Sequence, residues 1–152
     1  MKILVAYYSR TNTTKQIAEE IAKKLNADIE EITSKVNYSG KLGYAKGIKD
    51  AINEKIVDLE TLKYDPSDYD LIYLGVPVWS GKSANPILSY IKQNEGKFPD
   101  VKFFVTAGSS GFENAFNQMA TFIGKEPLKT LELTSKEIKN NDYINSLNNF
   151  LE

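Results

Sequence analysis

A short segment near the N-terminus carries an unusual concentration of hydroxyl and amide side chains. Five of the six residues from Ser9 to Thr14 are Ser, Thr or Asn, and they directly follow the apolar segment Lys2–Tyr8. Beyond them Ile17, Ile21 and Leu25 recur at helical spacing, which predicts a helix that starts at this turn. The first turn of a helix offers unpaired N–H groups and the positive end of the helix dipole. The segment therefore predicts an anion site.

The chemistry of this turn favours one phosphate group. It contains no Gly-Lys-Ser/Thr pattern of the kind that binds nucleotide triphosphates. A phosphate monoester held by O–H and N–H donors is typical of a mononucleotide cofactor. Thr13 and Gln16 are placed as a capping box at the start of the predicted helix. The alternative to phosphate binding is that the Ser, Thr and Asn residues only cap this helix. Capping needs one such residue, so five of them favour phosphate binding.

Composition limits the chemistry that the side chains can perform. The 152 residues contain no Cys and no His, which excludes disulfides, thiol nucleophiles, Cys or His metal ligands and a histidine base. The net charge of -1 argues against general nucleic-acid binding. We therefore expect a bound cofactor to supply the chemistry. We also expect one domain over residues 1–152 that needs no metal.

No segment predicts a membrane span or an export signal. A span needs about 18 consecutive apolar residues, and the apolar start at Met1–Tyr8 is too short even for a signal peptide. We expect a cytoplasmic monomer that associates with neither membrane nor nucleic acid.

Continuous apolar segments alternate with amphipathic ones, as in α/β proteins whose parallel sheet is buried on both faces. The expected strands are Ile3–Tyr7, Ala27–Ile32, Asp70–Val76, Val101–Thr106 and Leu128–Leu133. The expected helices are Thr14–Asn26, Tyr44–Lys55, a helix capped by Asn85 and closed by Gly96, Phe112–Ile123 with Gly124 as its stop, and Asp142–Leu151 with Ile144, Leu147 and Leu151 buried. This order predicts a single doubly wound sheet of five parallel strands.

Loops of small or hydrogen-bonding residues follow three of these strands. They are Ser9–Thr14, Pro77–Ser83 and Ala107–Gly111. Ligands of open α/β sheets lie at the carboxyl ends of the strands. Because all three loops should meet there, they predict one shared binding site.

These three segments resemble the flavodoxin family, in its short-chain form, and the resemblance covers essentially the whole chain. Ser9-Arg10-Thr11-Asn12-Thr13-Thr14 is similar to the phosphate loop, with Asn12 where glycine is usual. Gly75-Val76-Pro77-Val78-Trp79-Ser80-Gly81 and Thr106-Ala107-Gly108-Ser109-Ser110-Gly111 resemble the two loops that flank the flavin ring. The resemblance implies bound FMN, strand order 2-1-3-4-5 and one-electron transfer. It implies FMN contacts for Ser9, Arg10, Thr11, Asn12, Thr13, Thr14, Pro77, Val78, Trp79, Ser80, Gly81, Thr106, Ala107, Gly108, Ser109 and Gly111.

The residues allow more than one role at three positions. Trp79, the only tryptophan, is expected to form a flat wall against the flavin, or else to fold back onto the following helix. Arg10 either contacts phosphate or is a solvated surface charge. The second flavin loop has no aromatic residue; Phe112 is the nearest substitute, unless it starts the core face of its helix. Without a cover, one flavin face is open to a second planar molecule.

Two functions follow from this resemblance. The first is a low-potential one-electron carrier between two redox partner proteins, a reductase and an acceptor. The alternative is an NAD(P)H-dependent FMN reductase that acts on quinones or similar acceptors at an open flavin face. The acidic segment Glu54–Asp70 is either a docking patch for such partners or a solvated surface.

Overall fold

The fold is a parallel sheet with helices on both faces. The computed structural model describes residues 1–152. Its main strands are β1 (Ile3–Tyr8), β2 (Asp28–Ile32), β3 (Leu71–Trp79), β5 (Asp100–Ala107) and β6 (Thr130–Thr134). They are all parallel, in the order β2-β1-β3-β5-β6. This confirms the predicted order 2-1-3-4-5, because the short β4 (Lys82–Ser83) pairs only with β3.

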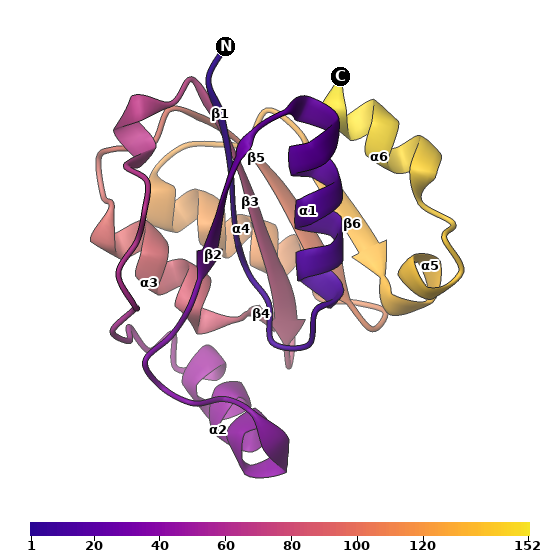
Figure 1. The fold of residues 1–152 in the computed structure, drawn as a ribbon. Helices are drawn as coiled ribbons and strands as arrows, with labels where there is room; N and C mark the ends of the chain where they lie inside the picture. The colour runs from indigo at the N-terminus through magenta and orange to yellow at the C-terminus, as the bar shows by residue number, and fades with distance from the viewer.

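Two hydrophobic clusters lie on opposite faces of the sheet. One contains buried residues of α1 (Thr13–Leu25), α5 (Ser135–Lys139) and α6 (Ile144–Leu151). The other contains residues of α3 (Asn85–Gln93), α4 (Phe112–Ile123) and the end of α2 (Gly40–Ile52). A single 3-10 turn covers Pro66–Asp68. Figure 1 shows α1 in front of the sheet, α3 and α4 behind it, and α2 at the bottom of the view, beyond the ends of β1 and β3. No helix has both the length and the apolar composition needed to cross a membrane.

The segment expected as the loop Pro77–Ser83 is instead the end of a β-hairpin. β3 continues to Trp79 because Val78 and Trp79 pair antiparallel with Ser83 and Lys82 of β4. Ser80 (φ 50°) and Gly81 (φ 80°) form the two-residue turn between them. Positive φ at both positions is the conformation that tight hairpins require. Trp79 is therefore held by strand pairing.

Three predictions about helix ends are wrong. α1 begins at Thr13, and its N-cap Asn12 makes no side-chain cap hydrogen bond, so Thr13 and Gln16 do not form a capping box. Asn12 has φ 64°, in the left-handed region that Asn tolerates, so the turn keeps its shape. Ala84, not Asn85, precedes α3; the Asn85 side chain is buried and donates to the backbone oxygen of Lys55. α3 ends before Asn94, and Gly96 lies in the turn beyond it.

The remaining helices match the sequence-based predictions to different degrees. α4 has the predicted bounds, with Gly124 in the left-handed conformation at its end. α2 begins at Gly40, four residues earlier than expected, and the short α5 was not predicted although a Thr134–Glu137 capping box marks its start. In α6, Phe150 is buried and Ile144 is exposed, opposite to what the sequence pattern suggested for Ile144.

Candidate functional site

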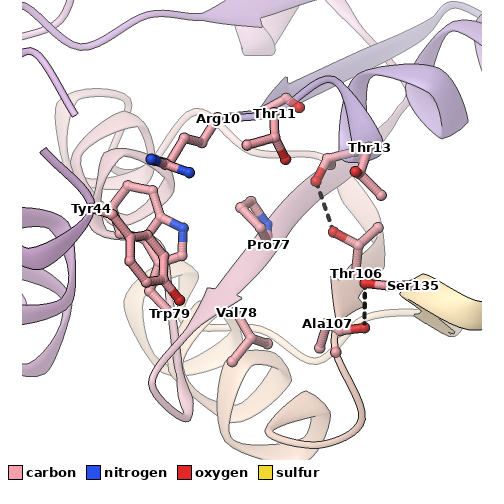
Figure 2. A pocket seen from close by; sticks show the side chains of 13 residues that line it. Arg10, Thr11, Thr13, Tyr44, Pro77, Val78, Trp79, Thr106, Ala107 and Ser135 are labelled. Atoms are coloured by element: carbon pink, nitrogen blue, oxygen red, sulfur yellow. Dashed lines mark hydrogen bonds between the residues drawn. The ribbon is translucent and has the colours of Figure 1, made fainter. Parts of the chain in front are cut away.

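A pocket opens at the carboxyl ends of β1, β3 and β5, where the three loops were expected to meet. Figure 2 shows Arg10 and Thr11 on one side, Tyr44 and Trp79 on another, and Thr106, Ala107 and Ser135 opposite them. Of the predicted contacts, it is lined by Ser9, Arg10, Thr11, Thr13, Thr14, Pro77, Val78, Trp79, Thr106, Ala107 and Gly108. Residues of all three loops line this one pocket, as expected from the sequence.

Five predicted residues do not line this pocket: Asn12, Ser80, Gly81, Ser109 and Gly111. Ser80 and Gly81 are the hairpin turn, and Gly111 is the N-cap of α4. Two lining residues were missed. Tyr44 stands in a polar stretch with no strand before it, and Ser135 follows β6, which was not counted among the loop-bearing strands. The Ser135 hydroxyl donates to the backbone oxygen of Ala107 at 3.3 Å.

The turn before α1 presents hydrogen-bond donors and no carboxylate. The backbone N–H groups of Thr13 and Thr14 donate to no group of the chain, and the Thr11 and Thr13 hydroxyls make no hydrogen bond. The Ser9 hydroxyl accepts from Lys15 N at 3.2 Å, and the Thr14 hydroxyl pairs with that of Thr106 at 2.8 Å. No Asp or Glu lines the pocket or stands in the first turn of α1. This donor set fits a phosphate group.

Arg10 connects the turn before α1 to the start of α2. Its Nε donates to the backbone oxygen of Tyr38 at 2.9 Å, and its Nη2 donates to that of Gly40 at 3.0 Å. The guanidinium lies 4.9 Å from the centre of the Tyr44 ring. Arg10 is therefore neither a free surface charge nor committed to phosphate alone, because two of its donors hold the start of α2.

We predict that Arg10→Lys loosens α2 more than the loss of one hydrogen bond would. Lysine keeps the charge but cannot donate to two carbonyls while stacking a planar group on Tyr44. The expected cost is about 1–2 kcal/mol of local opening free energy. Hydrogen–deuterium exchange of residues 40–52 measures it, with exchange in α4 as the internal control. Unchanged protection in α2 would contradict the linking role.

The aromatic residues around the pocket differ in how accessible they are. Trp79 is 3% exposed and packs edge-on against Tyr8 at 5.6 Å and Tyr38 at 5.2 Å between ring centres. Phe112 is 8% exposed and belongs to the core, so it does not substitute for a flavin cover. Tyr44 is 43% exposed. Stacking of Trp79 on a flavin stays a prediction, and Tyr44 becomes a second candidate.

A buried polar network fixes the wall behind Trp79. The Tyr38 hydroxyl donates to Asp50 at 2.7 Å and accepts from the Asn85 amide at 3.3 Å. Burial raises the pKa of the Tyr38 phenol, and burial likewise raises the pKa of Tyr8 to about 12. Both phenols are consequently neutral at physiological pH. Tyr7, Tyr8 and Tyr73 are buried core residues.

The sheet and its donor-rich pocket define an α/β protein built to hold an anionic ligand at the carboxyl ends of its strands. The family to which it belongs is also clear. A sequence model of the family described as Flavodoxin matches residues 2–150, so the chain belongs to the flavodoxin family. A comparison with curated protein sequences finds no match.

Several solved structures share the fold. A flavoprotein from Lactobacillus acidophilus in complex with FMN is 23% identical, with 91% of this chain and 97% of that chain covered and a TM-score of 0.76. Oxidised flavodoxin 2 from Bacillus cereus is 18% identical, with coverage of 99% and 97% and a TM-score of 0.56. An NADH:FMN oxidoreductase in its apo form is 12% identical, with coverage of 99% and 87% and a TM-score of 0.62.

Proposed function

We propose that this protein binds FMN in the pocket and carries electrons one at a time between a reductase and an acceptor protein. The observation that carries the proposal is the donor set before α1: free amides of Thr13 and Thr14, free hydroxyls of Thr11 and Thr13, and no carboxylate nearby. Family membership and the FMN complex of the Lactobacillus acidophilus flavoprotein support the choice of FMN.

Each side of the pocket has a part in this proposal. The turn before α1 holds the phosphate. Pro77, Val78 and Trp79 on the β3–β4 hairpin form one wall for the ring, and Ala107 and Gly108 approach from the other side. Tyr44 adds an exposed aromatic ring at the rim. When bound, the isoalloxazine ring supplies the redox chemistry by accepting and releasing one or two electrons.

The second candidate function is an NAD(P)H-dependent FMN reductase that acts on quinones or similar acceptors. It is favoured by one observation: the loop Ala107–Gly111 carries no aromatic side chain, and Phe112 is buried in the core. A ring face without an aromatic cover leaves room for a nicotinamide or quinone. The similarity in fold to an NADH:FMN oxidoreductase is compatible with this alternative.

Anaerobic reduction of the FMN-loaded protein separates the two functions. A carrier should be photoreduced in two separate one-electron steps and should react slowly with NADPH or NADH. Free FMN at the same concentration is the control. Rapid bleaching by NADPH, with direct passage to the two-electron-reduced form, would contradict the carrier and support the reductase.

A further inference from the structure

α2 packs against the rest of the molecule through its smallest residues. Gly43, Gly47 and Ala51 are buried one turn apart along one side of the helix. A Cβ at Gly43 would lie 2.4 Å from the backbone carbon of Tyr38, and one at Gly47 would lie 2.9 Å from the Trp79 ring. This close approach needs glycine at both positions. The fully buried apolar contacts of the helix are thus made by small residues.

Most of the large side chains of α2 point outward, while Ile48 is half-buried. Leu42 is 89% exposed and Ile52 is 51% exposed, in addition to Tyr44 at the pocket rim. A helix that served only the core would bury its large apolar residues. α2 instead exposes Leu42, Tyr44 and Ile52, so its outer side is the one left for a contact with another molecule.

The same outer side is positively charged. Between Ile32 and Asn53 the only carboxylate is Asp50, which is 4% exposed and accepts from Tyr38. The exposed charges of α2 are all lysines, Lys41, Lys46 and Lys49, of which Lys46 forms an ion pair with Asp50 at 3.9 Å. We call the residues Lys41, Leu42, Tyr44, Lys46, Lys49 and Ile52 the α2 face.

The α2 face borders the entrance to the pocket. Tyr44 lines the pocket, and Arg10 joins the start of α2 to the phosphate loop. In Figure 1, α2 stands beyond the ends of β1 and β3. The acidic residues Asp65 and Asp70 instead lie at the amino end of β3, where Asp70 accepts from the backbone N–H of Lys2. The exposed charges that α2 brings to this side of the pocket are therefore basic.

We propose that the α2 face docks an acidic electron-carrier protein, whose carboxylates approach the lysines and whose apolar side chains contact Leu42. This rests on the proposed function, because a partner must come close to the bound flavin. Opposite charge would steer the two proteins together, and the small apolar contact suits a short-lived complex. A membrane surface fits less well: Leu42 and Ile52 are about 15 Å apart along the helix, and Lys46 and Lys49 lie between them in the sequence.

The test uses a small acidic [2Fe–2S] ferredoxin as the probe. One electron passes from the reduced cluster, whose iron is oxidised, to the FMN of the loaded protein, and stopped-flow absorbance gives the rate. At low ionic strength we expect Lys41→Glu/Lys49→Glu to lower the second-order rate constant about tenfold or more. Salt should slow the unmodified protein and abolish the difference. Lys23→Glu/Lys24→Glu, at the far end of α1, makes the same charge change and should alter the rate less than about twofold.

Carbodiimide cross-linking and vesicle binding test the docking surface without measuring electron transfer. Carbodiimide cross-linking joins lysines directly to carboxylates without needing the flavin, and we expect its products with the ferredoxin to map to Lys41, Lys46 or Lys49. Equal rates for the two charge variants, or cross-links confined to other lysines, would overturn the docking surface. Binding to vesicles containing phosphatidylserine that depends on Lys41 and Lys49, with an unchanged ferredoxin rate, would replace the protein partner by a membrane.

The experiments distinguish an error in the proposed docking surface from an error in the proposed function. FMN affinity is measured first for every variant, and neither charge variant should change it because neither pair of lysines lines the pocket. A protein that takes up no FMN refutes the proposed function, and the cross-linking pattern still decides the docking surface.

Discussion

Thr13→Asp should lower the affinity for FMN at least about 100-fold, a loss of about 2.7 kcal/mol, without unfolding the protein. Thr13 is the first residue of α1, lines the pocket and has a free backbone N–H. A carboxylate at this point would repel the phosphate of FMN across a short distance. The same carboxylate stabilises the start of the helix by about 0.3–1 kcal/mol, because it lies at the positive end of the dipole. Binding and stability are therefore expected to move in opposite directions.

Fluorescence titration with FMN and urea unfolding measure the two effects. Asn145→Asp is the matched control: it places a carboxylate in the first turn of α6, which also has none, away from the FMN pocket. It should give the gain in stability and leave FMN binding unchanged. If Thr13→Asp binds FMN as the unmodified protein does, the turn before α1 is only a helix cap.

Trp79→Ala should lower the free energy of unfolding of the FMN-free protein by about 3–5 kcal/mol. Trp79 is 3% exposed, and it packs against Tyr8, Tyr38 and Gly47. Truncation leaves a cavity behind the hairpin that positions the pocket wall. Urea unfolding checks this value, and a loss below about 1 kcal/mol would contradict the packing role.

Stacking on the flavin needs milder variants than Trp79→Ala. Trp79→Phe keeps an aromatic ring in the core, while Tyr44→Leu removes an exposed ring at little cost to stability. If Tyr44 covers the flavin, Tyr44→Leu should weaken FMN binding by about 0.5–1.5 kcal/mol and Tyr44→Phe should not. Equal affinities for Tyr44→Leu and the unmodified protein would rule out Tyr44 as the cover of the flavin ring.

The sheet was predictable because its strands are nearly continuous apolar segments. β1, β3 and β5 are buried on both faces, and burial on both faces is what produces such runs. α4 was bounded correctly because Gly111 and Gly124 adopt left-handed conformations at its two ends. Apolar runs and helix-ending glycines are local patterns of neighbouring residues, so the sequence alone is enough to locate them.

The features that the sequence did not predict depend on contacts between residues far apart in the sequence. α2 has a weak apolar pattern because Gly43 and Gly47 pack against Tyr38 and Trp79, and those partners are visible only in the fold. Tyr44 was missed for the same reason. The hairpin was read as a loop because Pro77 and the Ser80-Gly81 pair suggest a break, whereas that pair makes a tight turn between paired strands. Asn85 looked like a helix cap because its buried bond to Lys55 cannot be seen locally.

The most direct test of the account is a comparison of FMN with riboflavin, which lacks the phosphate, in fluorescence titrations of the FMN-free protein. We expect FMN to bind one to one, with a dissociation constant of about 1 μM or lower, and riboflavin to bind at least about 100-fold more weakly. The difference should disappear in Thr13→Asp. Equal affinity for the two flavins, or no quenching of FMN at all, would contradict the assignment of the turn before α1 as the phosphate site.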